Sequence, residues 1–439
     1  MAASVIINII AGALIVLVLS VVIFSRVNLH PDEFSHIAAS TYFQNHWFKL
    51  AVDHPSMLQT LIPGWGTSYL FLNDIVYSLA EKFTGFLVPL GVTDFVRYRL
   101  FNFALLPVLL VLFLANRRNG LWFLLAFALS TQTWYLFSYF NGDALSMFFS
   151  LLLGFYYVSN RTAIDPFFWG RAEFNNTVAL FYMLCVLVMF TRLQYPIIVF
   201  FIIGLIFVSN ATELNFKSAL KAITRLAMFL VLIALPVGAA ELKDQWVNDF
   251  AKDQAIETIR EENKRPEFKV EHIKATGSNP HLLYLKQTGH SYSDLFTNHP
   301  WAEWSFQSFF GVYGFMNIKA PKTFYKLSSA LGAGVTMAFL LFSALRGDRR
   351  TAFIVAYLLL CISLVIVQSS MYSWLYGFQA QGRYLLAVIP MIAVTLALNP
   401  YRKKVPLVAV QYYVLAILLM NVIGFAAYGV IPMTGIGSG

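Results

Sequence analysis

The sequence predicts an all-α polytopic membrane protein, and its composition and apolar patterning are the evidence. Of the 439 residues, 58% are hydrophobic, 16% are aromatic and only 12% are charged. A soluble domain carries about 25% charged residues, so a soluble globular protein is excluded. The apolar residues gather into long runs such as 4–24, 121–140 and 351–367, and about 20 such residues make one helical crossing of a bilayer.

About eleven transmembrane helices are expected from these runs. Their expected ranges are 4–25, 99–115, 121–140, 143–158, 177–191, 195–209, 222–240, 327–345, 351–370, 385–398 and 406–429. The first run lacks a basic start and a small-residue cleavage site, so we expect a retained helix and not a removed signal peptide. Cys185 and Cys361 fall inside apolar runs, where we expect small buried hydrophobes and no disulfide.

The basic residues predict the orientation of the chain in the membrane. With a cytoplasmic N-terminus every short inner connection is basic, as the positive-inside rule requires. These connections hold Arg117 and Arg118, Arg161 and Arg171, Lys217 and Lys221, Arg346 with Arg349 and Arg350, and Arg402 with Lys403 and Lys404. The net charge of +9 is therefore assigned to topology, and no nucleic-acid partner is expected.

This orientation places the C-terminus and two long loops, 26–98 and 241–326, on the extracytoplasmic side. The expected organisation is an N-terminal transmembrane module (1–240) that includes the first loop, the second large loop, and a C-terminal transmembrane module (327–439). Both loops are expected to contain interfacial helices. The candidate segments are Phe34 to Trp47, Thr67 to Phe86, Glu241 to Asn263 and the aromatic stretch Trp301 to Phe315. No internal repeat of the kind found in many transporters is evident.

The segment His30-Pro31-Asp32-Glu33-Phe34-Ser35-His36 contains the strongest candidate for catalysis. Two adjacent carboxylates, Asp32 and Glu33, follow the first helix at the expected bilayer edge, and His36 lies one helical turn past Asp32. Together they form a compact group of proton acceptors suited to general base catalysis. An equally weighted interpretation is an ordinary helix start, with Asp32 as the N-cap and Glu33 in the first turn.

A further acid, Asp143, follows the expected third helix in Tyr139-Phe140-Asn141-Gly142-Asp143. It lies at the same membrane face as Asp32, where it is expected to position a sugar hydroxyl or to support the base, while Trp134 and Tyr135 offer ring faces for stacking. The competing interpretation is a tight turn between two helices, because Asn-Gly is a strong turn signal.

Two arginines are expected at the outer interface, where topology does not favour positive charge. Arg192 lies in a short connection between helices, and Arg383 lies in Gln379-Ala380-Gln381-Gly382-Arg383-Tyr384. A guanidinium there suits bidentate capture of a lipid phosphate, with Tyr384 beside it. Snorkelling of either side chain to the interface is the alternative.

A metal site is not part of the expected mechanism, although a divalent metal is kept as a minor alternative. All eight histidines fall in the two long loops: His30, His36, His46, His54, His272, His281, His290 and His299. No pair has the i, i+4 spacing of a metal-binding helix, and no phosphate-binding Gly loop or zinc-protease motif is present. No cofactor is therefore expected.

In these segments the chain resembles the GT-C superfamily of integral membrane glycosyltransferases. Asp32-Glu33 matches the acidic motif of the first outer loop, and Asp143 matches a further acid in the next outer loop. Gly311-Val312-Tyr313-Gly314-Phe315-Met316-Asn317 and Gln381-Gly382-Arg383-Tyr384-Leu385-Leu386 look like segments of a related, poorly characterised bacterial membrane-protein family. The chain departs from many members in lacking a large C-terminal soluble domain.

The resemblance implies a hexosyl- or pentosyltransferase of the bacterial inner membrane with a periplasmic active site. The implied donor is a sugar on undecaprenyl phosphate, and the implied acceptor is a glycan, a lipid-linked glycan or a protein, as in O-antigen lipopolysaccharide modification of the cell envelope. Asp32 would be the general base of an inverting transfer, with Arg383 and Arg192 on the phosphate. Glu33 and Asp143 would orient the substrates.

Two other function classes remain open at this stage. A transporter or flippase of a lipid-linked or small polar solute would use the outer acids and arginines as a gate, although its ionisable groups should lie near the bilayer midplane. A glycan polymerase or ligase would use the same outer loops, and its products would grow by many repeat units instead of one sugar.

Overall fold

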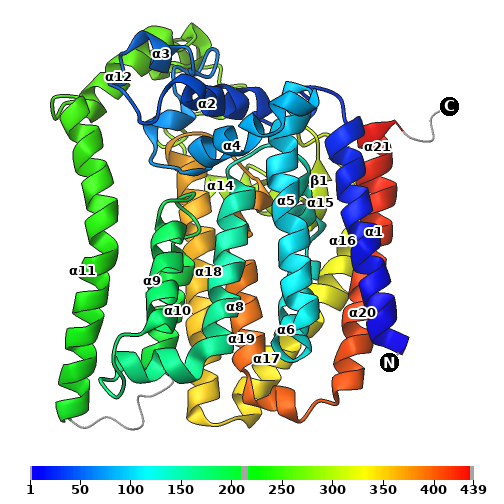
Figure 1. The fold of residues 1–439 in the computed structure, drawn as a ribbon. Coiled ribbons are helices and arrows are strands. Elements are labelled where there is room, and N and C mark those ends of the chain that lie inside the picture. The colour runs from blue at the N-terminus through cyan, green and yellow to red at the C-terminus, as the bar shows by residue number, and fades with distance from the viewer. Residues whose placement is uncertain (1, 209–215, 436–439) are drawn as a thin grey trace.

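The computed structural model describes residues 2–208 and 216–435, and this part of the chain is all-α apart from one two-stranded hairpin. Long helices stand side by side in a bundle, and a layer of shorter elements covers one end (Figure 1). We call this layer, residues 25–93 and 248–321, the cap layer. The chain starts with α1 (Ala2–Phe24) at the opposite end, and α21 (Ile431–Thr434) finishes at the cap-layer end (Figure 1).

Six helices are long and apolar enough to cross a membrane. They are α1, α5 (Asp94–Ala115), α11 (Phe216–Val247), a helix made of α16 (Lys322–Leu327), η6 (Ser328–Gly334) and α17 (Val335–Arg346), α18 (Arg349–Leu375), and a helix made of α20 (Leu407–Phe425), η9 (Ala426–Val430) and α21. A seventh results if α6 (Arg117–Ala128), α7 (Thr131–Tyr135) and η3 (Leu136–Ser138) form one span bent by 94°. The chain is therefore a multi-pass membrane protein.

The expectation of about eleven spans is wrong, because several apolar runs fold into helices too short to cross alone. These are α9 (Asn176–Met189), α10 (Ile197–Val208) and η7 (Gly382–Leu385) with α19 (Val388–Leu398). The run that forms α8 (Asp143–Phe168) is interrupted by non-helical backbone at Asn160. At 1.5 Å per residue, the 12 residues of α10 rise about 18 Å, against a hydrocarbon core of about 30 Å.

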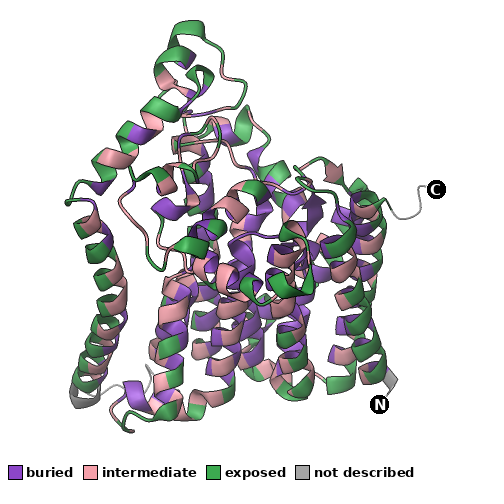
Figure 2. Cartoon of the chain, turned by 45° about the horizontal axis from the view of Figure 1, so that its top comes forward, coloured by how far each residue is buried: buried purple, intermediate pink, exposed green. Residues whose placement is uncertain are grey.

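The short helices are apolar because they are buried in protein. Nearly every residue of α19 is buried, and it packs against α6, α8 and α18. Buried positions concentrate where these helices meet, whereas α11 at the edge of the bundle is mostly exposed (Figure 2). A single hydrophobic core joins the N-terminal and C-terminal transmembrane modules, with α1 against α20 and α6 against α19.

The cap layer is built from both long loops. Its helices and strands are α2 (Glu33–Asn45), α3 (Pro55–Leu58), η1 (Tyr69–Phe71), α4 (Val76–Gly85), η2 (Val88–Leu90), α12 (Lys252–Asn263), η5 (Pro266–Phe268), α13 (Val270–Thr276), α14 (Asp294–Thr297), α15 (Trp301–Gly311), β1 (Val312–Tyr313) and β2 (Ile318–Lys319). In the antiparallel hairpin Val312 pairs with Lys319. The helix expected at Phe34 to Trp47 is confirmed as α2, but the stretch Thr67 to Phe86 is helical only in η1 and α4.

The charged stretch 241–263 is not one helix. Helix α11 continues through Val247, and α12 starts at Lys252. Between them Asp249 and Phe250 take left-handed backbone conformations, with φ of 53° and 60°, which a continuous right-handed helix cannot contain. The turn brings α12 over the first loop, where Ile259 packs in one hydrophobic cluster with Val52 and Met57. Lys49 Nζ in the same loop lies 2.8 Å from Asp244 Oδ2 near the end of α11.

The basic clusters of the sequence gather at the end of the bundle opposite the cap layer. Two hydrogen bonds show this: Arg402 Nη1 donates to Asn119 Oδ1 at 3.0 Å, and the Tyr401 hydroxyl in η8 (Pro400–Lys403) donates to the Arg346 carbonyl. In addition, Arg161 lies close enough for its charge to act on Arg350, and Gly170 lies beside Lys221. The side chain of Lys217 falls outside the described part of the chain. The positive-inside rule predicts that this basic end faces the cytoplasm.

The two ends can be distinguished by cysteine labelling, because Cys185 and Cys361 are buried. Asp53→Cys and Lys274→Cys place exposed thiols in the cap layer, whereas Arg118→Cys and Arg349→Cys place them at the basic end. In sealed right-side-out vesicles we expect a membrane-impermeant maleimide to modify only the first two, and the others after permeabilisation. Modification of thiols at both ends in sealed vesicles would contradict this topology.

Candidate functional site

Asp32 occupies the N-cap position of α2, yet its side chain makes no capping hydrogen bond. Its backbone is left-handed, with φ of 59°, which costs a residue other than glycine about 1 kcal/mol and is often found at functional sites. The carboxylate is 41% exposed, and its Oδ2 lies 3.5 Å from Arg383 Nη2. The structure therefore joins two candidates that are 351 positions apart in the sequence.

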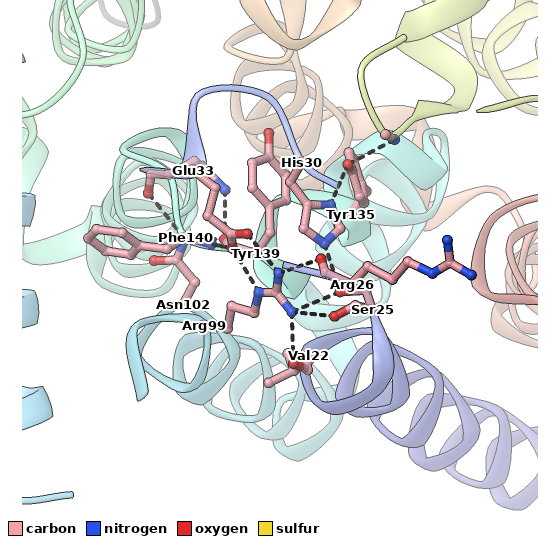
Figure 3. A network of polar contacts seen from close by, with 12 residues as sticks. Val22, Ser25, Arg26, His30, Glu33, Arg99, Asn102, Tyr135, Tyr139 and Phe140 are labelled. Carbon is pink, nitrogen blue, oxygen red and sulfur yellow. Dashed lines mark hydrogen bonds and ion pairs between the residues drawn. The ribbon is translucent and has the colours of Figure 1, made fainter. Parts of the chain in front are cut away.

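Glu33, the next residue, is fully buried and paired with Arg99 (Figure 3). Arg99 Nε and Nη2 each donate to one Glu33 carboxylate oxygen at 2.7 Å, which is the bidentate geometry of strong ion pairs. Glu33 Oε1 also accepts from the backbone N–H of Phe140 at 3.2 Å. Both oxygens of Glu33 are therefore engaged inside the protein. Of the two adjacent carboxylates, Asp32 and Glu33, only Asp32 is accessible.

Arg99 also caps the C-terminal end of α1. Its Nη1 donates to the carbonyls of Val22 and Ser25 at 3.3 and 3.0 Å, and its Nη2 donates to the carbonyl of Arg26 at 3.1 Å (Figure 3). The last carbonyls of a helix have no partner within it, and a cation there also interacts favourably with the helix dipole. One guanidinium thus fixes the end of α1 to the start of α2.

His30 holds the segment before Asp32 in place. The imidazole is fully buried, with Nδ1 2.7 Å from the Tyr135 hydroxyl and Nε2 2.8 Å from Ser25 Oγ. Its ring stacks on Tyr139, with centroids 4.9 Å apart. Both ring nitrogens are therefore used by the protein, and His30 fixes the path of the chain into Pro31 and Asp32.

Arg383 lies in η7 and is held close to α15 by its glycine neighbour. The Gly382 N–H donates to Ser308 Oγ, and a Cβ at Gly382 would collide with the backbone of Phe309. The Arg383 side chain is 8% exposed, and its Nη2 donates to the Tyr384 hydroxyl at 3.2 Å. Its Nε is buried and has no hydrogen-bond partner within the described part of the chain.

A narrow cleft of about 10 Å³, with room for about one water molecule, lies beside the Asp32–Arg383 pair. Four segments singled out in the sequence contribute to its wall: the acidic segment, the aromatic segment before Asp143, the Gly311–Asn317 hairpin and the Gln381–Leu386 segment. Its lining includes Pro31, Gln132, Tyr135, Tyr139, Gly314 and Arg383. Segments distant in sequence thus line one narrow cleft with few, convergent polar groups.

Asp143 is buried at the first residue of α8, but the cap of that helix comes from Asn141. Asn141 Oδ1 accepts from the backbone N–H groups of Asp143 and Ala144 at 2.9 and 3.0 Å. The Asp143 carboxylate instead accepts from Gln194 Nε2 at 2.8 Å. The tight turn expected at Asn-Gly is present, and Asn141 leaves the Asp143 carboxylate free of a capping role.

Arg192 contacts a second cluster of polar and aromatic side chains, which lies next to the cleft. Its Nη2 donates to the Tyr77 hydroxyl at 2.7 Å and lies 3.4 Å from His36 Nδ1, and its guanidinium lies over the Tyr69 ring at 4.8 Å. Its Nε is 3.3 Å from Asp74 Oδ2. The charges of Asp32, Arg192 and Arg383 all act on the Tyr69 hydroxyl, so the two arginines belong to one electrostatic site.

Burial shifts the protonation of two groups in this cluster. It lowers the pKa of His36 well below the ordinary value, and the charges of Arg192 and Arg383 lower it further, so the imidazole is neutral at pH 7. Burial raises the pKa of Asp74 from 3.8 to about 6, although Arg192 opposes the shift. Asp74 is therefore the carboxyl group in this cluster whose charge changes near neutral pH.

The aromatic candidates separate in the structure. Tyr135 lines the cleft, where its hydroxyl accepts from the backbone N–H of Gly314 at 3.0 Å. Trp134 is fully buried in the bundle core, and its indole N–H donates to the Phe127 carbonyl at 3.1 Å. Neither Trp134 nor Tyr135, which is 1% exposed, thus has an open ring face for a ligand to stack on in this structure, although Tyr135 lines the cleft and Tyr384 lies beside Arg383.

Sequence reasoning missed Arg99, Asp74, Gln132 and Tyr139. Arg99 starts an apolar run, which was a usable signal, because a cation at such a position is costly without a partner. Asp74 looked like one more polar residue of an amphipathic stretch. Gln132 and Tyr139 carry no charge, and only the fold places them in the cleft wall.

Within residues 2–208 and 216–435, no group of three or more His, Cys, Asp or Glu side chains could hold a metal ion. Cys185 and Cys361 are both free and buried, as expected. Comparison of the chain with protein-family models, with curated proteins and with solved structures found no significant match.

The Arg99–Glu33 pair gives a stability prediction. Arg99→Met leaves the buried Glu33 carboxylate uncompensated, and breaking such a pair costs about 3–5 kcal/mol. We expect a clear fall in the thermal unfolding midpoint of the purified protein. The control is Arg260→Met, which removes an exposed pair with Glu257 and should cost about 0–1 kcal/mol. Adding Glu33→Gln to Arg99→Met should recover part of the loss, and no recovery would contradict the pairing argument.

The raised pKa of Asp74 predicts a pH-dependent stability. Its folded pKa of about 6 exceeds its ordinary value of 3.8, so this group's contribution is lost as the pH rises through 6. Between about pH 5 and pH 7.5, the wild type should lose ~1 kcal/mol relative to Asp74→Asn. Chemical unfolding of both proteins at the two pH values measures this difference, and a constant difference would show that the pKa is not raised.

Proposed function

We propose that the protein is a glycosyltransferase that moves a sugar from a polyprenyl phosphate, such as undecaprenyl phosphate, to a hydroxyl group of an acceptor. One observation carries the proposal: Asp32 Oδ2 lies 3.5 Å from Arg383 Nη2 beside the cleft. A carboxylate that can accept a proton thus adjoins a cation that can bind a phosphate. Both lie at one end of a membrane bundle, where a lipid-linked sugar presents its reactive carbon.

The transfer is a single displacement. The acceptor oxygen bonds to the anomeric carbon as the bond from that carbon to the phosphate oxygen breaks. Asp32 takes the hydroxyl proton, and the polyprenyl phosphate leaves with the electron pair and one more negative charge. Arg383 is 8% exposed, and a cation in such a water-poor site stabilises this developing charge strongly. The configuration at the anomeric carbon is inverted.

The neighbouring residues have distinct roles in this proposal. Arg192 adds positive charge to the phosphate region, and Asp143 with Gln194 holds sugar hydroxyls. Tyr135 lines the sugar cleft, while Tyr384 and the neutral His36 orient the two guanidinium groups. Glu33 acts as a positioning residue, because its pairing with Arg99 fixes the backbone on which Asp32 lies.

The placement of buried charge favours interfacial chemistry over transport. Among the described residues, buried charged side chains lie in or against the cap layer, except Asp165, which pairs with Arg161 at the basic end. The buried charged side chains in or against the cap layer are those of Glu33, Arg99, Asp143, Asp244, Lys252, Lys264 and Arg383. A transporter would place such groups near the bilayer midplane. With the basic end cytoplasmic, the proposed site faces the periplasm of a bacterial inner membrane.

The proposal predicts that Asp32→Asn and Arg383→Ala each lower transfer by about 10²-fold or more, since each removes a group that acts in the transition state. The assay follows labelled sugar from a synthetic polyprenyl phosphate donor into acceptors in host membranes. Asp253→Asn removes an exposed carboxylate of α12 and should leave transfer unchanged.

Near-normal transfer by folded Asp32→Asn would remove Asp32 from the role of base. No transfer by the wild type over several sugars would overturn the proposed function and favour a flippase, which flux measurements in vesicles would then detect. Products extended by many repeat units would favour a polymerase.

A further inference from the structure

A second and larger cavity lies beside the site, between the first loop of the cap layer and α11. This lateral groove has a volume of about 260 Å³, close to the lower end of the range of small-molecule sites, roughly 300 Å³. Its walls are aromatic and aliphatic and include Phe43, Trp47, Leu72, Phe190, Ala240 and Val247. Since α11 is a candidate membrane span at the edge of the bundle (Figure 1), the groove adjoins the region that lipid chains occupy.

Two exposed aromatic rings border the groove and are held by cations. Trp47 is 75% exposed and Phe48 is 66% exposed. The Lys82 ammonium lies 4.0 Å from the Trp47 ring centroid, and the Lys243 ammonium lies 3.2 Å from that of Phe48. Rings that are fixed in this way and remain exposed provide stacking surfaces for the apolar faces of sugar rings.

The polar lining of the groove contains a carboxylate that is paired with Arg192. Asp74 lines the groove with a 4% exposed side chain. Its Oδ1 accepts from the Val76 N–H at 3.0 Å, and its Oδ2 lies 3.3 Å from Arg192 Nε, an ion pair in which neither of these two atoms makes a hydrogen bond within the described part of the chain. A hydroxyl-bearing ligand would add the hydrogen bond that this ion pair lacks.

The far wall of the groove is fixed by charge. Lys49 and Lys252 lie 2.8 and 2.5 Å from Asp244 Oδ2, and Asn248 Oδ1 accepts from the Val52 N–H at 2.7 Å. These contacts hold the upper end of α11 against the first loop. These ion pairs and this hydrogen bond therefore hold the groove in shape, in addition to the packing of its apolar side chains.

Arg192 lies between Asp74, which lines the groove, and the group of residues around the cleft. This guanidinium contacts Asp74 on the groove side and lies near His36, on which the charge of Arg383 also acts. A headgroup in the groove would therefore lie next to the group of residues that contains Asp32.

We propose that the lateral groove binds an amphiphilic acceptor, in which an apolar chain is joined to a hydroxyl-bearing sugar headgroup. The chain lies along the apolar wall beside α11, and the headgroup stacks on Trp47 or Phe48 and donates a hydroxyl to Asp74. This inference rests on the proposed function and narrows its acceptor from glycans in general to lipid-linked glycans.

The test uses the full-length protein in phosphatidylcholine nanodiscs and an alkyl glucoside that carries a photoreactive diazirine on its chain. We expect cross-links to the groove wall, including Leu72, Phe190 and Val247, identified by mass spectrometry. Excess unlabelled alkyl glucoside should compete, whereas glucose should not. Competition by phosphatidylglycerol to the same extent would overturn the proposal in favour of a plain phospholipid site.

Two variants test the groove and the carboxylate separately. Leu72→Trp, at an exposed position, should block the groove without affecting folding and reduce cross-linking at least tenfold. Asp74→Asn should weaken alkyl glucoside binding about tenfold, because it removes a hydrogen bond to a charged group. Asp53→Asn, in the same loop but outside the groove, should match the wild type. Unchanged binding by folded Leu72→Trp would overturn the proposal.

The failure of this inference differs from that of the proposed function. In the transfer assay, Leu72→Trp should raise the KM for a lipid-linked acceptor at least tenfold and leave the KM for the donor unchanged. Transfer that depends on Asp32 but is equally good with soluble acceptors and with Leu72→Trp would overturn the groove assignment alone. Cross-linking in the groove without any transfer would support the binding site and overturn the transferase.

Discussion

The arrangement of the whole site depends on the bidentate pair between Arg99 and Glu33. Arg99 belongs to a membrane helix, α5, and Glu33 starts the first helix of the cap layer. The same guanidinium binds the last carbonyls of α1. Three elements thus meet at one buried cation, and the only chain between α1 and α2 is the short segment that carries His30 and Asp32. The position of the exposed carboxylate follows from this buried pair.

Sequence patterns selected several charged residues that the structure brings together, but they overestimated the number of spans. Asp32, Asp143, Arg192 and Arg383 stood out because charge at the end of an apolar run is unusual, and the structure places all four around one group of contacts. The number of spans was overestimated because hydropathy reports burial in any apolar medium. It cannot separate a helix surrounded by protein, such as α19, from one surrounded by lipid.

The sequence does not show which charged side chains contact each other in the fold. Glu33 and Asp32 are adjacent and chemically similar, and nothing local indicates that one is buried against Arg99 while the other faces Arg383. The same holds for Asp74, whose importance comes from Arg192, a residue 118 positions later in the chain. Such pairs depend on long-range topology, which short motifs do not encode.

The short buried helices have a consequence for biosynthesis. Helices such as α10 and α19, with 12 and 11 residues, cannot be released singly into lipid as they leave the ribosome, because each is too short to cover the hydrocarbon thickness. They pack against longer neighbours, α8 and α18 for both of them. Because α18 follows α10 in the chain by more than a hundred residues, the packing around α10 is complete only after α18 has been synthesised.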